Sequence, residues 1–132
     1  MIPSQRNLNR DDELRQKLMG IPVIYSGGAF SFNNMSLKTL KSLFENGFID
    51  LEDCQNESPT IGQFKDFVEK YPNENIRFIG YLISPERDDY RISIEGIEAK
   101  SHNIEFMKNF AKLFSMADEF VCEVGHQRCW YD

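Results

Sequence analysis

The sequence lacks the features that place a chain in or across a membrane. No apolar run approaches the roughly 20 residues that a transmembrane helix needs. Residues 1–6 also lack the basic and then apolar order of a secretory signal peptide. We therefore expect a cytoplasmic protein that does not bind membranes.

Cysteine is scarce, and its three positions are odd in number and unevenly spaced. A disulfide framework needs pairs, so we expect reduced thiols. Cys122 and Cys129 nevertheless flank His126 in the order Cys-x₃-His-x₂-Cys. Zinc takes such ligands, but a closed site needs a fourth. We expect no cofactor or metal, and Cys122, His126 and Cys129 are the weak candidates for a metal site, a ligand site or a small enzyme's centre.

Positive charge is in deficit. The chain has 15 Lys plus Arg against 21 Asp plus Glu, a formal net charge of −6. Nucleic-acid phosphates attract proteins with a basic surface, so we expect no nucleic acid as a partner. The acidic balance suits either ordinary solubility or a basic protein partner.

Recognisable catalytic and nucleotide-binding motifs are also missing. Gly27-Gly28 lacks the lysine and hydroxyl residue of a phosphate-binding loop. The acidic stretch 50–57 lacks the alternating ligands and central glycine of a calcium loop. An enzyme needs a convergent polar site, and no spacing reveals one. A non-enzymatic domain is the favoured expectation.

The material for one folded domain over residues 1–132 is present, with 41% hydrophobic residues and eleven phenylalanines. Apolar spacing of three and four predicts helices between Ser36 and Gly47, from Ser58 to Tyr71, and from about Asn103 to Phe114, besides a short one before Gly20. Strands are predicted at 21–25 and 119–124, with a central hairpin at about 76–97. The expected fold is α+β, a mostly antiparallel sheet covered by three to four helices.

Two known motifs resemble parts of this order of elements. The sequence of helix, strand, strand, helix and strand over 58–124 matches most of a ferredoxin-like motif. The two helices before the hairpin outline a winged helix-turn-helix, a nucleic-acid-binding fold. Residues 36–100, however, hold eight Lys plus Arg and thirteen Asp plus Glu. This charge disfavours the nucleic-acid alternative.

The tip of the predicted hairpin carries residue types that anchor protein interfaces. These are Arg87, Asp88, Asp89, Tyr90 and Arg91. The alternative is that they form a turn with local ion pairs. We expect a protein-binding module, immunity- or adaptor-like, that offers an acidic surface and the 85–91 tip to its partner.

Aromatic side chains near the end of the sequence form a second candidate contact. Trp130 and Tyr131 are large and amphipathic, as interface anchors often are. The alternative is that they pin this end of the chain onto the core. The sequence leaves both alternatives open.

Overall fold

The computed structural model describes residues 7–132 as four helices and one five-stranded sheet. The helices are α1 (Asp12–Met19), α2 (Leu37–Glu45), α3 (Ile61–Glu69) and α4 (Ile104–Phe114). The strands are β1 (Ala29–Met35), β2 (Arg77–Ile83), β3 (Ile92–Ala99), β4 (Glu119–Glu123) and β5 (His126–Trp130). The predicted α+β class is confirmed, and the hairpin β2–β3 lies at the centre of the sheet.

The sheet is antiparallel throughout, in the order β1-β2-β3-β5-β4. A ferredoxin-like motif contains split βαβ units, in which two strands joined by a helix run in the same direction with a third strand between them. The structure has one such unit, because β3 and β4 run in the same direction, α4 joins them in the chain, and β5 lies between them. The predicted partial likeness to a ferredoxin-like motif therefore holds for this unit.

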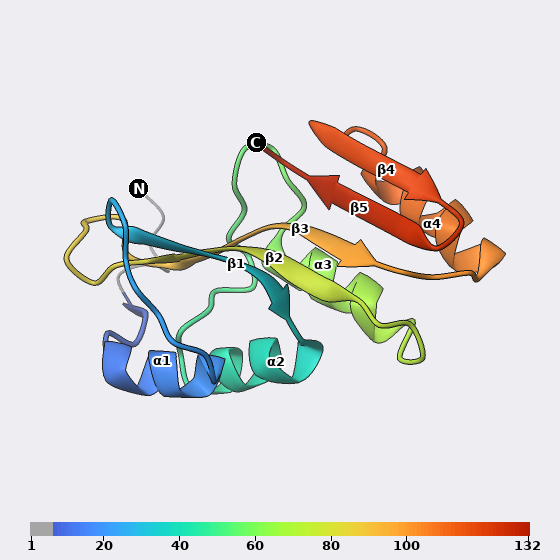
Figure 1. Ribbon diagram of the computed structural model, residues 1–132. Coiled ribbons are helices and arrows are strands. Elements are labelled where there is room, and N and C mark those ends of the chain that lie inside the picture. Colours follow the sequence, from blue (N-terminus) through green and yellow to red (C-terminus); the bar gives the residue numbers. More distant parts are fainter. Residues whose placement is uncertain (1–6) are drawn as a thin grey trace.

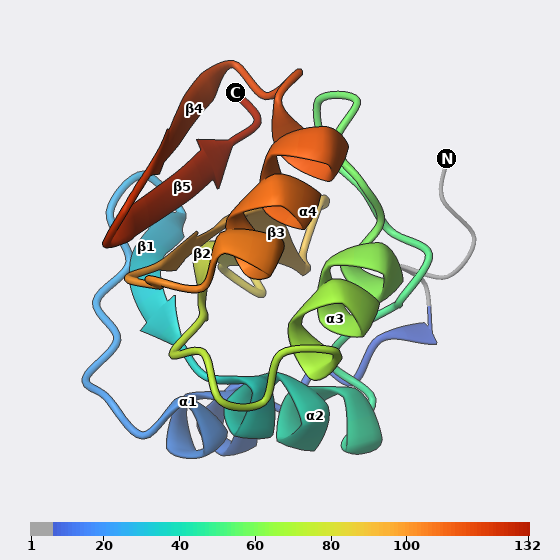
Figure 2. The ribbon, with the colours of Figure 1, turned by 90° about the vertical axis from the view of Figure 1, so that its right-hand side faces the viewer.

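All four described helices lie on one side of the sheet (Figures 1 and 2). Phe78, Leu82 and Ile94 of the central strands belong to the same buried core cluster as the aromatic side chains of α3 and α4. Phe67 lies edge-on to Phe114, with ring centroids 5.0 Å apart. The opposite face of the sheet carries no helix within residues 7–132 (Figure 2).

Local capping explains where the helices start. Ser36 caps α2 by accepting the Thr39 N–H, as its sequence predicts. The predicted Ser58 cap for α3 is wrong by two residues. Thr60 caps this helix in a capping box with Gln63, whereas the Ser58 hydroxyl donates to the Pro59 carbonyl.

Two strand predictions also need correction. Residues 21–25 are apolar but form no strand, and only Ser26 beyond them makes an isolated bridge, to Ala29. Conversely, β5 is a strand that the sequence does not predict, because its core-facing Gln127 is polar. That amide is fully buried and bonds the backbone of Ser101 and Glu123. Its satisfied bonds allow a polar residue on the core-facing side of a strand.

The winged-helix outline lacks its defining parts. A helix-turn-helix joins its helices by three or four residues, but residues 46–60 separate α2 from α3. The hairpin β2–β3 is the middle of a sheet and not a projecting wing. Within residues 7–132, no helix is both long and apolar enough for a bilayer crossing.

Candidate binding pocket

The tip of the β2–β3 hairpin is occupied by contacts within the chain. Tyr90 is only 2% exposed, and its hydroxyl donates to the Asn9 carbonyl at 2.6 Å. The guanidinium carbons of Arg10 and Arg15 each lie 4.5 Å from the centre of its ring. Tyr90 therefore ties the hairpin to α1 and is not available to a partner, which corrects its assignment as a contact residue.

Three charged residues of the tip, Arg87, Asp89 and Arg91, pair with one another. Arg87 donates twice to the Asp89 carboxylate, and Arg91 donates to it at 3.1 Å. Burial alone would raise the pKa of Asp89, but these guanidinium bonds outweigh burial and hold the pKa below its usual value. Asp88 is exposed. The tip is therefore a turn with local ion pairs at Asp89, although the buried Nε of Arg91 has no hydrogen-bond partner among the described residues.

Arg15 lies at the centre of a buried hydrogen-bond network that the sequence did not predict. Its guanidinium is fully buried and donates to the Ile83 carbonyl at 2.7 Å and the Tyr25 hydroxyl at 2.8 Å. Asp12 accepts from Arg15 at 3.0 Å and from Tyr25 at 2.7 Å. The sequence signal was the placement of Arg15 one helical turn before Met19, on the same face of α1.

The three weak metal candidates do not converge. Cys129 faces the core, and burial raises the pKa of its thiol to about 12. His126 lies three residues earlier in β5, on the other face of the sheet, where its Nε2 is 2.7 Å from Glu98. Cys122 lies 3.6 Å from the Met107 carbonyl. No group of three or more metal-ligating side chains occurs among residues 7–132.

Trp130 and Tyr131 leave β5 in opposite directions. Trp130 lies on the open face of the sheet. Its ring packs against that of Tyr81 in a T-shaped arrangement, with the ring centroids 5.9 Å apart. Tyr131 is buried, and its ring centre lies 6.1 Å from that of Phe64 in α3. The structure thus places Tyr131 as a pin on the core, while Trp130 remains half-exposed.

The open face also holds an unusually buried acid. Glu95 is 7% exposed and accepts a hydrogen bond from Ser93 at 2.7 Å. Burial raises the pKa of Glu95; the Ser93 bond and the Arg91 charge only partly oppose this, and the Asp132 charge adds to it. The carboxyl group is therefore easier to protonate in the folded chain than in the unfolded chain.

Glu95→Gln is expected to make the stability less dependent on pH. Because the folded pKa is raised, the folded chain holds this proton more tightly, and that stabilisation is complete below about pH 4.5 and is lost as pH rises through the folded value. The stability of Glu95→Gln relative to that of the wild type should therefore increase as the pH rises from acidic to neutral. Urea unfolding across this range, with the exposed Glu86→Gln as control, would contradict the prediction if all three profiles stayed parallel.

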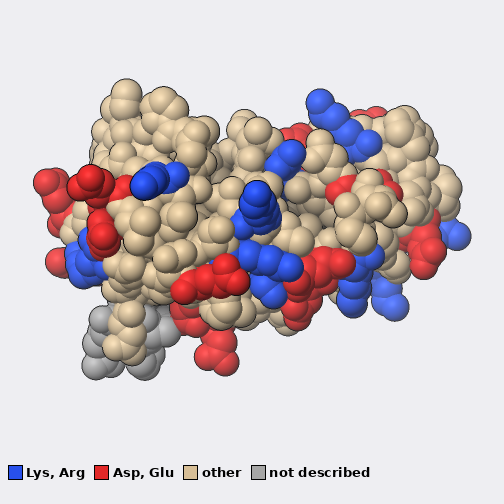
Figure 3. Space-filling view, turned by 90° about the horizontal axis from the view of Figure 1, so that it is seen from below, with Lys and Arg blue, Asp and Glu red and all other residues tan. Residues whose placement is uncertain are grey.

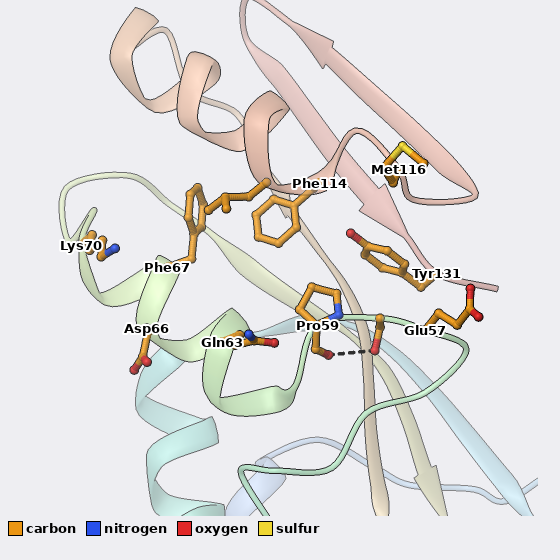
Figure 4. A pocket seen from close by; sticks show the side chains of 11 residues that line it. Glu57, Pro59, Gln63, Asp66, Phe67, Lys70, Phe114, Met116 and Tyr131 are labelled. Atoms are coloured by element: carbon orange, nitrogen blue, oxygen red, sulfur yellow. Dashed lines mark hydrogen bonds between the residues drawn. The ribbon is translucent and has the colours of Figure 1, made fainter.

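A pocket of about 530 Å³ lies between α3, α4 and the end of β5. Figure 4 shows Phe67, Phe114 and Tyr131 around its apolar floor, with Pro59 beside them. Leu113 and Met116 line it and are 54% and 90% exposed. The volume falls in the range of ligand sites, and exposed apolar side chains beside an apolar cavity mark an interaction surface.

The polar side chains of this pocket come from α3, its C-cap residue and the segment before it. They are Glu57, Ser58, Gln63, Asp66 and Lys70. Asn56 and Glu57 both adopt positive φ, at 52° and 62°. Two consecutive residues with side chains in this region cost conformational energy, which proteins retain most often at functional sites.

Sequence reasoning missed this pocket for a definable reason. Leu113 and Phe114 read as parts of one broad apolar face of a helix, and the structure splits them, because Phe114 is buried and Leu113 is exposed. The sequence did contain one indication of the pocket. The apolar face of α4 is wider than packing against one sheet would bury, so part of it had to remain exposed. No protein-family model, curated protein or solved structure matches the chain.

Proposed function

We propose that the protein is a non-enzymatic protein-binding module, of immunity- or adaptor-like type, whose contact site is the pocket between α3 and α4. The observation that carries this proposal is the aromatic floor of the pocket beside the exposed Leu113 and Met116. Binding energy at protein interfaces concentrates where an apolar side chain fills such a pocket. The partner would insert an aromatic or aliphatic side chain there.

The face that carries α1 and α2 and the hairpin tip offer less to a partner. Figure 3 shows the face that carries α1 and α2, where basic and acidic residues are interspersed. Such a surface has no field of one sign to orient a charged partner. At the hairpin tip, Arg87 and Arg91 already pair with Asp89.

Leu113→Arg is expected to weaken partner binding at least about tenfold, because a guanidinium in the mouth of the pocket must lose water when the apolar anchor enters. The matched control is Ile104→Arg, since Ile104 lies on the same helix, is 56% exposed and does not line the pocket. A partner captured from native cells by wild-type protein should be purified and titrated against both variants by calorimetry. Equal binding by Leu113→Arg and wild type would refute the pocket as the contact site.

A further inference from the structure

A second hollow of about 380 Å³ adjoins the pocket and shares three lining residues with it, Glu57, Met116 and Tyr131. Its remaining lining residues are Asn56, Asp118 and Asp132. Three of its six residues are therefore acidic, and none is basic. A partner segment that fills the first pocket would therefore lie directly beside this acidic second hollow.

The carboxylates of this second hollow have no basic side chain as an ion-pair partner among the described residues, so they can pair with a lysine or arginine of another molecule. Glu57, Asp118 and Asp132 are all exposed, and none makes an ion pair within the described residues 7–132. Asp118 accepts the backbone N–H of Asp132 through one oxygen, at 2.7 Å. This bond fixes the direction of the Asp118 carboxylate and leaves its other oxygen for a partner.

The side chain of Tyr131 forms the wall between the two hollows, and burial is the main influence on its pKa. Burial, followed by the charges of Cys129 and Asp118, raises the pKa of Tyr131 to about 12. The ring therefore stays neutral and can pack against an apolar group on one side while carboxylates line the other. Glu57 also lines both hollows. Its backbone has a positive φ, a conformation that glycine adopts without strain but that glutamate does not.

We infer that the partner presents a lysine or arginine side chain next to its apolar anchor, so that the anchor fills the first pocket and the cation enters the acidic hollow beside it. This inference rests on the proposed function and specifies the chemistry of the partner. Charge-assisted bonds to Glu57 and Asp118 would set the register of the partner segment and speed its association.

Selection from a phage-displayed library of random peptides tests this directly, with each selected peptide then synthesised and titrated by fluorescence anisotropy. The inference predicts peptides that join an aromatic or aliphatic residue to a nearby Lys or Arg. Glu57→Gln/Asp118→Asn should weaken them about three- to tenfold, and added salt should do the same. The control Glu86→Gln/Asp88→Asn removes two exposed charges at the hairpin tip and should have no effect.

The outcomes separate this inference from the proposed function. Peptides that lose binding in Leu113→Arg but ignore the Glu57/Asp118 change would overturn the basic partner and leave the pocket as the contact site. Peptides that bind Leu113→Arg as tightly as wild type, or no selectable peptide, would overturn both. A dimer in sedimentation that Leu113→Arg dissociates would make a second copy the occupant and would also overturn the basic peptide segment.

Discussion

Replacing Arg15 by methionine is expected to lower the free energy of unfolding by about 3–5 kcal/mol. Methionine keeps most of the apolar stem but removes every guanidinium bond. The Ile83 carbonyl, the Tyr25 hydroxyl and the Asp12 carboxylate would each lose a buried donor. Burial alone would raise the pKa of Asp12, and the bonds from Tyr25, Gln16 and Arg15 now hold that pKa below its usual value.

Urea denaturation followed by circular dichroism would measure this loss. Lys17→Met is the matched control, because Lys17 is exposed on the same helix and should change stability by less than about 0.5 kcal/mol. A loss below about 1 kcal/mol for Arg15→Met would mean that water replaces the guanidinium bonds, and the network would then not hold α1 to the hairpin.

Gly80→Ala is expected to cost about 3 kcal/mol or more. A Cβ at Gly80 would lie 1.8 Å from the Ser93 carbonyl oxygen of the neighbouring strand. This obstacle is backbone in the middle of the sheet, so no side-chain rotation can relieve it. The register between β2 and β3 shifts at this glycine, between Ile79 and Gly80, and the two strands would have to separate there.

Gly27→Ala provides the comparison for that measurement. Gly27 has φ of 63°, but a Cβ there would meet no atom within 4 Å. Its substitution should therefore cost only about 1–2 kcal/mol, the penalty of a left-handed conformation. Thermal unfolding of the two variants separates them, and equal losses would show that contact across the strands is not the cause at Gly80.

The elements that the sequence predicted well are those with local signals. For α2 and α4, a capping residue precedes apolar side chains at helical spacing, and the structure confirms both helices. The central hairpin follows from the alternation of apolar and polar residues between Tyr90 and Ile97, where β3 forms. Residues 21–25 look equally apolar, yet Tyr25 uses its hydroxyl to bond Asp12 instead of joining a sheet. This contact with the preceding helix α1 is not visible in the apolar pattern of residues 21–25.

The candidate site was harder to predict, because its residues come together only through tertiary packing. Phe67, Phe114 and Tyr131 come from α3, α4 and the end of β5. The sequence indicated that each is apolar or aromatic but not that their packing leaves a cavity. Conversely, Tyr90 and Cys129 have side-chain chemistry typical of binding sites, but the structure buries both in the interior of the protein.

The outer strands of the sheet affect how the protein behaves at high concentration. An open strand edge can recruit another chain and begin aggregation. One edge, β1, is irregular, because its pairing skips between Phe32 and Met35. The other, β4, is only five residues long and has glutamate at both ends. Both edges discourage fibril growth, so the molecule can expose an apolar pocket while its sheet stays closed to unrelated chains.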